Sequence, residues 1–308
     1  MISICIPTYN RPGLLREALE SCFAQTYTDY EIIIGDDSKN EASAELVAEY
    51  VEHHADRIRY QHNVPSLGQA ANVNDLFARA RGERLVLLHD DDALLPVALE
   101  RLAACWDAQP GLVAAFGKQI IIDHAGTPRT DSDAVNATYH RVSANAGRQA
   151  VPAVAGLLRM FPNDGYMVLT EAARAAGYRS RAEVGDACDT DFGLRLCAAA
   201  AEVWFVDEFL AKYRNSDDSI TSQNFLEPFA YDVIRTTPVP AAALPARRRA
   251  LEDLAPNATS GFAQLGRPGE ALAVFTSPYY TLRDKLRPRA AYHAGLIAAA
   301  YVRNLVRR

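Results

Sequence analysis

Aspartate residues gather in this sequence at points where short apolar runs end. Asp36 and Asp37 follow the run Ile32–Ile34, and the triplet Asp90–Asp92 follows Leu85–Leu88. Aspartate is common in solvated turns, but three adjacent carboxylates repel one another, which a turn does not require. A hard divalent cation such as Mg²⁺ or Mn²⁺ removes this repulsion, because it prefers oxygen ligands and shares them with a diphosphate. The triplet therefore predicts a metal site.

The neighbouring candidates are less decisive. The pair Asp36–Asp37 is either a cap at a strand-to-helix junction or a nucleoside-binding pair that accepts hydrogen bonds from a base or a ribose. His89 fits packing better than metal ligation, although Mn²⁺ accepts imidazole. Asp186 and Asp189 form a third acidic cluster, just before or at the start of a predicted helix.

A regular alternation of strands and helices is predicted to position these clusters. Runs such as Ile32–Ile34 and Leu85–Leu88 have no polar face, as parallel strands covered by helices on both sides require. The alternation predicts a doubly wound α/β sheet, whose ligands bind outside the carboxyl ends of the strands. The predicted strands are 3–6, 31–35, 58–61 and 84–88, and the predicted helices are 12–23, 42–54, 68–81 and 96–107.

The pattern loosens in the second half of the chain. A strand is predicted over 118–123, and a polar stretch without clear periodicity then extends to Ala150. Loops of that length are usually functional, so we expect this stretch to shape an acceptor site. Helices are predicted over 151–160, 170–176 and 189–200, with a strand over 202–207. Beyond Phe225 the chain is expected to be helical and broken by prolines, namely Pro238, Pro240, Pro245, Pro256 and Pro268.

Composition is that of an ordinary globular protein, since the 308 residues are 49% hydrophobic and 23% charged. The length favours one large domain with a smaller appendage. The net charge of −6 conceals a split, because the chain from Arg235 onward carries 12 Lys and Arg against 4 Asp and Glu. The acidic remainder argues against nucleic acid as the principal partner, since phosphate binding needs clustered cations.

Cysteines and apolar segments indicate the compartment. The five cysteines form no Cys-x-x-Cys pair, and their apolar neighbours indicate buried free thiols, which suits a reducing environment. The first residues lack the basic flank and apolar run of a secretory leader, and no segment has the roughly 20 apolar residues that span a bilayer. We therefore expect a cytoplasmic protein.

Four segments of the chain resemble family 2 glycosyltransferases: Ser3–Arg11, Ala24–Ser38, Ala80–Pro96 and Cys188–Leu196. They are similar to the opening of that family, to its acidic motif at a strand end (the DXD motif) and to its catalytic-base helix. The resemblance implies the GT-A fold, a Rossmann-like, mostly parallel sheet flanked by helices, in a catalytic domain of residues 1–221. Residues 222–308 would then form a helical, basic C-terminal extension.

This resemblance implies an inverting, metal-dependent enzyme that transfers a sugar from a nucleotide-diphosphate donor, with a UDP-sugar expected first. The acceptor would be a hydroxyl of a glycan or of a lipid-linked glycan, as in polysaccharide, O-antigen or other surface-glycan biosynthesis. Bound Mn²⁺ or Mg²⁺ would neutralise the leaving diphosphate, and one carboxylate would accept the hydroxyl proton. Attack from the face opposite the diphosphate inverts the anomeric carbon without a covalent intermediate.

Carried over by position, the resemblance also implies residue roles. Asp189 would be the general base, with Asp191 as the competing choice, and Asp91 would be the main metal ligand, supported by Asp92. The nucleotide-binding residues would be Pro7, Thr8, Tyr9, Arg11, Asp37, Asn74 and Asp90. Further contacts with donor or acceptor would come from Asp186, Asp191, Asp217 and Asp218.

Three positions depart from the family pattern. His89 stands where the family usually has Asp, Ser216 replaces a metal-binding His of many members, and Val73–Asn74 replaces a common Arg-Asn pair. The metal would then be held more weakly, or Asp217 or Asp218 would compensate. These departures keep a second function open, a non-catalytic nucleotide-sugar-binding or assembly subunit. Receiver domains and sugar nucleotidyltransferases fit poorly, because the first predicted strand is followed neither by an acidic pair nor by a Gly-rich loop.

The C-terminal stretch Tyr292–Arg308 places apolar residues at helical spacing beside arginines. One interpretation is an amphipathic helix on the inner face of an anionic membrane, which would bring the enzyme to a lipid-linked acceptor. The other is a helix that packs on the catalytic domain or on a second copy of the chain. The mild hydrophobicity around Ala299 slightly favours packing.

Overall fold

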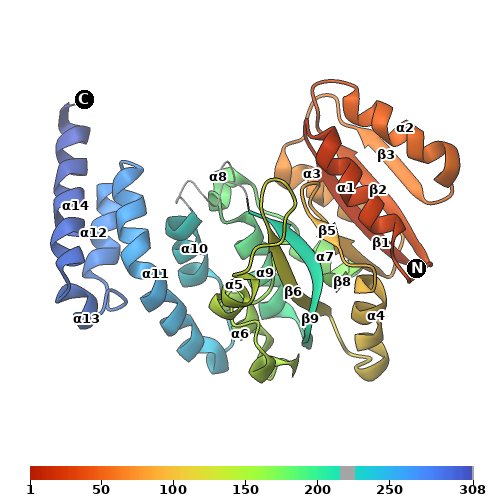
Figure 1. Ribbon diagram of the computed structural model, residues 1–308. Coiled ribbons are helices and arrows are strands. Elements are labelled where there is room, and N and C mark those ends of the chain that lie inside the picture. Colours follow the sequence, from red (N-terminus) through yellow and green to blue (C-terminus); the bar gives the residue numbers. More distant parts are fainter. Residues whose placement is uncertain (216–225, 307–308) are drawn as a thin grey trace.

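The computed structural model describes residues 1–215 and 226–306 and shows a central sheet covered by helices on both faces, followed by a C-terminal group of helices (Figure 1). The strands are β1 (Ile2–Thr8), β2 (Tyr30–Asp36), β3 (Ile58–His62), β4 (Arg84–Leu87), β5 (Ala93–Leu94), β6 (Ala114–Ile122), β7 (Gly147–Arg148), β8 (Met167–Leu169) and β9 (Val203–Arg214). The helices of the sheet region are α1 (Pro12–Phe23), α2 (Ala42–His54), α3 (Gln69–Arg79), α4 (Ala98–Ala108), α5 (Ser132–Thr138), α6 (Pro152–Leu157), α7 (Thr170–Ala176), α8 (Arg181–Val184) and α9 (Cys188–Ala199). Those of the C-terminal group are α10 (Leu226–Thr236), α11 (Leu244–Gln264), α12 (Pro268–Thr276), α13 (Leu282–Lys285) and α14 (Pro288–Val306).

The strand order is β3-β2-β1-β4-β8-β6-β9-β5, with β7 paired to β9. The first four strands are parallel, as the sequence predicts, and β6 and β9 are also parallel to each other. Between these two groups the short strand β8 runs antiparallel to both β4 and β6. The start of β8 therefore lies beside the end of β4, and it pairs with the first residues of β6.

Two apolar cores cover the two faces of the sheet. Alternate residues of β1, β2 and β4 point to opposite sides: Ile4 and Ile32 pack with α1, α2 and α4, whereas Cys5 and Ile33 pack with α3, α7 and α9. This explains why the strand segments are apolar at every position. All five cysteines are buried and unpaired, which confirms the prediction of free thiols.

The C-terminal helices continue the second of these cores. Helix α10 packs on α9, and α11 packs on α6 and α10, so their buried residues join one cluster with those of the sheet. The prediction that prolines break every helix here is wrong at Pro256, which lies inside α11. Buried Ala255 and Ala258 on either side of it hold the helix in the core, which offsets the lost backbone hydrogen bond. Pro245 and Pro268 instead occupy first turns, where no such bond is lost.

Candidate active site

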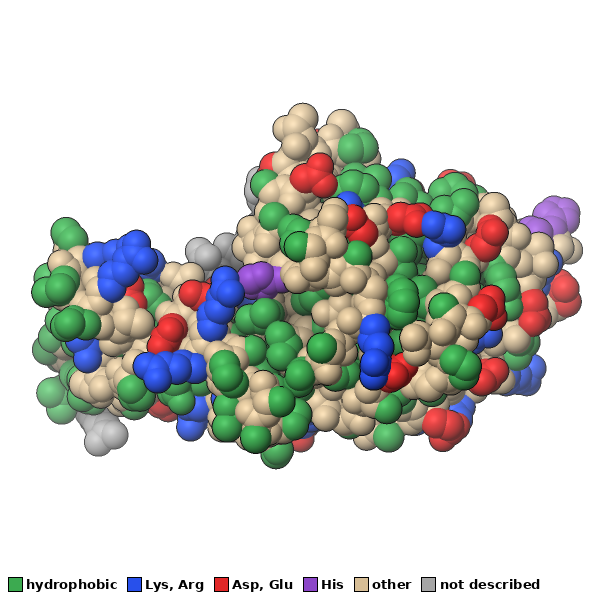
Figure 2. All heavy atoms as spheres, turned by 90° about the horizontal axis from the view of Figure 1, so that it is seen from below, with side chains coloured by type: hydrophobic (Ala, Val, Ile, Leu, Met, Phe, Trp, Pro, Cys, Tyr) green, Lys and Arg blue, Asp and Glu red, His purple; other side chains and the backbone are tan. Residues whose placement is uncertain are grey.

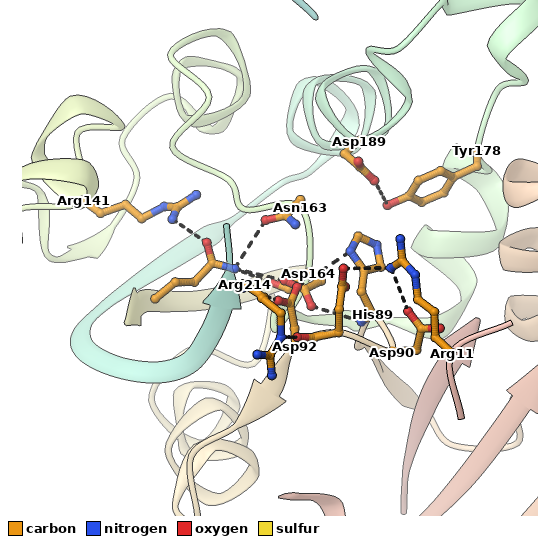
Figure 3. A network of polar contacts seen from close by, with 12 residues as sticks. Arg11, His89, Asp90, Asp92, Arg141, Asn163, Asp164, Tyr178, Asp189 and Arg214 are labelled. Carbon is orange, nitrogen blue, oxygen red and sulfur yellow. Dashed lines mark hydrogen bonds and ion pairs between the residues drawn. The ribbon is translucent and has the colours of Figure 1, made fainter. Parts of the chain in front are cut away.

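The predicted acidic clusters meet at one edge of the sheet (Figure 3). His89–Asp92 follow β4, Thr8 ends β1, and Asp37 follows β2, with its backbone N–H donating to the Thr8 carbonyl at 3.0 Å. Helix α9 brings Asp189 to the same place, where its charge acts on the partly buried His89 ring. Thr8 and Asp189, which are 181 positions apart in the chain, therefore border one region.

Asp90 is the best-connected carboxylate of the triplet. It accepts hydrogen bonds from the Thr8 hydroxyl at 2.7 Å and from the Tyr9 backbone N–H at 3.4 Å. Burial and the neighbouring Asp91 raise the pKa of Asp90 to about 6, against the lowering effect of Thr8 and Arg11. Arg11 lies across the triplet and donates to Asp91 at 2.9 Å and to Asp90 at 3.4 Å. The guanidinium thus supplies positive charge at the position where a cation is predicted.

His89, Asp91 and Asp92 form the cluster best suited to a metal ion among the described residues. One ligand atom from each lies within 4.8 Å of the others. Asp92 is buried and accepts a hydrogen bond from the Arg214 backbone N–H, whereas its Oδ2 atom has no hydrogen-bond partner in the part of the chain that the structure describes. Two carboxylates and one imidazole are ligands that Mn²⁺ accepts, so the residues fit a divalent cation. His89 belongs to this cluster, whereas the sequence favoured a packing role for it.

A second buried carboxylate, Asp164, contacts this cluster through the backbone of His89. It is fully buried, accepts a hydrogen bond from the His89 backbone N–H at 3.1 Å, and accepts another from Gln119 at 3.0 Å. Burial and the charge of Asp164 raise the pKa of Asp92 well above its usual range. Positive charge at this point would therefore relieve a strained arrangement of carboxyl groups.

Asp189 lies in the first turn of α9 and lines a cavity. Its carboxylate accepts a hydrogen bond from the Tyr178 hydroxyl at 3.1 Å. Burial raises the pKa of Asp189, while His89 and Tyr178 oppose that shift. The side-chain amide of Asn74 bonds both main-chain polar atoms of Tyr178, at 2.7 and 2.9 Å. Asn74 was predicted to contact the nucleotide. In the structure its amide nitrogen donates to the Tyr178 carbonyl and its amide oxygen accepts from the Tyr178 N–H, so Asn74 positions Tyr178.

The other predicted aspartates have different surroundings. Asp191 is fully buried and is held by Arg179 and Arg195, so its carboxylate is closed to a ligand. Asp186 lines the cavity and pairs with Arg181 at 2.6 Å. Asp37 accepts hydrogen bonds from Asn63 and from the backbone of the loop that precedes α3, so it stabilises the conformation of that loop. Asp217 and Asp218, like Ser216, lie outside the described residues.

The cavity beside Asp189 measures about 240 Å³. The polar stretch before Ala150 supplies part of its wall, in Val135, Tyr139 and Arg141, and its role in acceptor binding stays a prediction. Its remaining polar lining includes Gln119, Arg159, Asn163, Arg181, Thr190, Tyr213 and Asn215. Pro7, Thr8, Tyr9 and Arg11 lie outside this lining, on the side of the metal-binding candidates.

Sequence reasoning missed Asp164, Tyr178 and Arg214. Asp164 is positioned by a turn at Gly165, whose φ of +68° favours glycine. The motif Asn163-Asp164-Gly165 before an apolar run was a usable turn signal. Arg214 ends β9 and pairs with Glu17 of α1, a contact across 197 positions that no local pattern reveals.

Comparison with known proteins identifies the family of the chain. The family model described as glycosyl transferase family 2 matches residues 3–164. WcaA of Escherichia coli K12, whose name assigns it to colanic acid biosynthesis as a glycosyl transferase, is 31% identical over 212 residues, which is 68% of this chain and 70% of WcaA. A β-1,3-glucosyltransferase of Campylobacter jejuni that acts on GalNAc(5)-diNAcBac-PP-undecaprenol is 35% identical over 121 residues, 39% of this chain and 38% of that protein.

Solved structures share the fold. Staphylococcus aureus TarS 1-349 superposes with a TM-score of 0.68 at 16% identity, covering 97% of this chain and 88% of that one. The mannosyltransferase PcManGT of Pyrobaculum calidifontis, solved with GDP-Man and Mn²⁺, superposes with a TM-score of 0.61 at 17% identity, covering 99% and 86%. These likenesses confirm the predicted GT-A architecture with its helical C-terminal region. By its sequence and its fold, the chain belongs to glycosyl transferase family 2.

Proposed function

We propose that this glycosyltransferase moves a sugar from a nucleotide-diphosphate donor, with a divalent cation, to an acceptor hydroxyl, and inverts the anomeric centre. The observation that carries the proposal is the position of Asp189. Its carboxylate lines a cavity beside the cluster of His89, Asp91 and Asp92, and the described structure gives it no arginine or lysine partner. It is therefore available to accept a proton from a molecule in that cavity.

The base would act through hydrogen bonding and position. An acceptor hydroxyl within hydrogen-bond reach of Asp189 would pass its proton to the carboxylate as its oxygen attacks. Tyr178 holds one carboxylate oxygen and so orients the other. Because one base is sufficient, the reaction needs no covalent sugar–enzyme intermediate, and an α-linked donor would give a β-linked product.

Donor binding would fall to the triplet and its neighbours. Asp91, with Asp92 and His89, would hold the cation, and Asp90 and Thr8 would lie beside the ribose. A bound divalent ion would neutralise charge on the departing diphosphate. Arg11 is placed to move from the carboxylates to the diphosphate as the donor binds. UDP is the first nucleotide to test, because the structural neighbour TarS was solved with UDP and with UDP-GlcNAc.

A donor screen tests this proposal. UDP-, GDP- and dTDP-sugars would be incubated with the full chain and Mn²⁺, and release of the nucleoside diphosphate would be measured, since many transferases slowly pass sugar to water. We expect the full chain to hydrolyse the sugars of one nucleotide class. In calorimetry, we expect the variant Asp91→Ala to lose the Mn²⁺-dependent heat of UDP binding. Unchanged heats in that variant would refute the metal assignment. Binding without any hydrolysis or transfer would instead support the alternative of a non-catalytic subunit.

The C-terminal helix α14 suggests that the enzyme binds its acceptor at a membrane surface. Within the described residues no helix is long and apolar enough to cross a bilayer. The outward face of α14 is nevertheless apolar from Ala291 to Val302, and basic residues flank it at Arg289 and Arg303. Figure 2 shows apolar and basic side chains together at this end of the molecule. We propose that this face rests on an anionic membrane that carries a lipid-linked acceptor.

A further inference from the structure

Two arginines converge on one aromatic ring in the wall of the cavity beside Asp189. The guanidinium carbons of Arg141 and Arg159 both lie 5.4 Å from the centroid of the Tyr139 ring. All three residues line the cavity. Tyr139 and Arg141 follow α5, and Arg159 follows α6, so two separate segments bring positive charge to this point.

Arg141 is a buried cation with no carboxylate in direct contact among the described residues, although the charge of Asp164 acts on it from farther away. Its side chain is 6% exposed, donates from Nε to the Met160 carbonyl at 2.8 Å, and donates from Nη1 to the Gln119 side chain at 2.9 Å. No carboxylate of the described residues lies within ion-pair distance of it, and burial lowers its pKa to about 10. An unpaired buried charge is costly, so its presence here calls for a compensating ligand.

Arg159 is unpaired as well. Among the described residues its interaction is with the Tyr139 ring alone, and its side chain is half-buried in the cavity wall. Its backbone has a φ of +53°, an uncommon conformation for a residue with a side chain. Such strain persists where the surrounding structure requires the side chain in one place, as at binding sites.

We propose that this cavity binds an acceptor that carries a phosphate or carboxylate group, held by Arg159 and Arg141. Guanidinium groups present planar pairs of donors that match both anions. The acceptor would lie with its anionic group near Tyr139 and its reacting hydroxyl near Asp189. Figure 3 shows Arg141 and Asp189 well separated, with Asn163 between them, so the two ends do not compete for one position. This inference rests on the proposed transfer function, because it names the acceptor class of that site.

The test uses small probes and the full chain. Glycerol 3-phosphate and glucuronate are the anionic probes, and glycerol and glucose are their neutral counterparts. Each is titrated calorimetrically in the presence of Mn²⁺ and UDP, which occupy the nucleotide side. We expect at least one anionic probe to bind, neither neutral probe to bind comparably, and Arg159→Gln to weaken binding about tenfold or more. Arg159→Lys keeps the charge and should retain part of the affinity.

The matched control is Arg16→Gln, since Arg16 is an exposed arginine of α1 that pairs with Glu49 away from the cavity. It should leave probe binding unchanged. Equal binding of neutral and anionic probes, or unaltered affinity in Arg159→Gln, would overturn the inference. A separate UDP titration distinguishes the two proposals: UDP binding without anionic-probe binding refutes only the acceptor class. Arg159-dependent probe binding without any nucleotide binding refutes only the donor proposal. The probe that binds identifies the anion as phosphate or carboxylate.

Discussion

Asp189 and Asp191 stand two residues apart in α9, yet their carboxylates have opposite surroundings. Asp189 lines a cavity and accepts a hydrogen bond from the neutral Tyr178 hydroxyl. Asp191 is enclosed between Arg179 and Arg195. A general base must be able to take up a proton, and two adjacent cations oppose protonation. The environments therefore favour Asp189 as the base, which the sequence proposed from motif position alone.

We expect Asp189→Asn to reduce transfer by at least about a thousandfold while donor affinity stays within a few-fold, because loss of the base removes proton transfer and leaves nucleotide contacts intact. The free energy of unfolding should be equal or higher at neutral pH, since burial raises the Asp189 pKa and an ionised buried carboxylate costs stability. Product formation, calorimetry with the donor and urea unfolding would measure these effects. Turnover close to that of the unsubstituted enzyme would remove Asp189 from the role.

Tyr178→Phe should change the pH dependence of the reaction. The Tyr178 hydroxyl favours the ionised form of Asp189, so its removal raises the Asp189 pKa further. Activity requires the ionised base, and therefore the acidic limb of the kcat/KM profile should move to higher pH. We expect a loss of roughly 2- to 10-fold below neutral pH, as for one hydrogen bond, and a smaller loss in alkaline buffer. A profile that falls uniformly without moving would contradict this account.

Arg11 lies at the predicted cation position, because it donates to both Asp90 and Asp91. Replacing it should have opposite effects on two ligands. In Arg11→Gln, Mn²⁺ alone should bind a few-fold more tightly, since a competing positive charge is gone, whereas UDP should bind more weakly in the presence of saturating Mn²⁺. Calorimetric titrations of each ligand would show this. Weakening of both would mean that Arg11 supports the metal site instead of competing with it.

At the scale of elements, α9 is fixed to its neighbours through Asp191. Arg195 bonds Asp191 and also donates to the Ala176 and Gly177 carbonyls at the end of α7. Asp191→Ala would leave two guanidinium groups without their shared anion, at a cost of about 3 kcal/mol in the free energy of unfolding. Urea unfolding would measure the change, with Asp189→Asn as the control on the same helix. An unaltered midpoint would show that Asp191 is not a structural anchor.

Local pattern predicted the elements that carry strong periodicity and missed those defined by distant contacts. The bounds of α2 and α7 agree with the structure, because their apolar spacing and end signals lie within the helix itself. Strand β8 was missed, since three residues are too few to show a period. Asp36, Asp90 and Asp91 were placed at strand ends correctly. The position of Asn74 opposite Tyr178, 104 residues away, depends on the packing of α3 against α7 and is invisible in either segment.

Across the whole molecule, α14 lies at one end, whereas α9, which carries Asp189, lies in the middle (Figure 1). The inner face of α14 packs on α11 and α12 through Ala290, His293, Ile297 and Ala300. That contact agrees with the packing interpretation for one face and leaves the other exposed, including Val302 and Leu305. If two copies of the chain paired through the exposed face, the arginines at the ends of one α14 would lie against those of the other, and their charges would repel. Anionic headgroups would neutralise the same charges, so we favour a membrane as the occupant.

Vesicle binding tests this choice. The full chain should co-sediment with vesicles of phosphatidylcholine and phosphatidylserine, and much less with phosphatidylcholine alone, because apolar burial and charge neutralisation both contribute. The double substitution Val302→Glu and Leu305→Glu should weaken this binding at least tenfold, since it places two anions on the face that meets the lipid. Leu272→Glu is the matched control, as Leu272 is an exposed leucine of α12 outside that face. Dimers that the same double substitution dissociates, without any vesicle binding, would instead assign the face to a second copy of the chain.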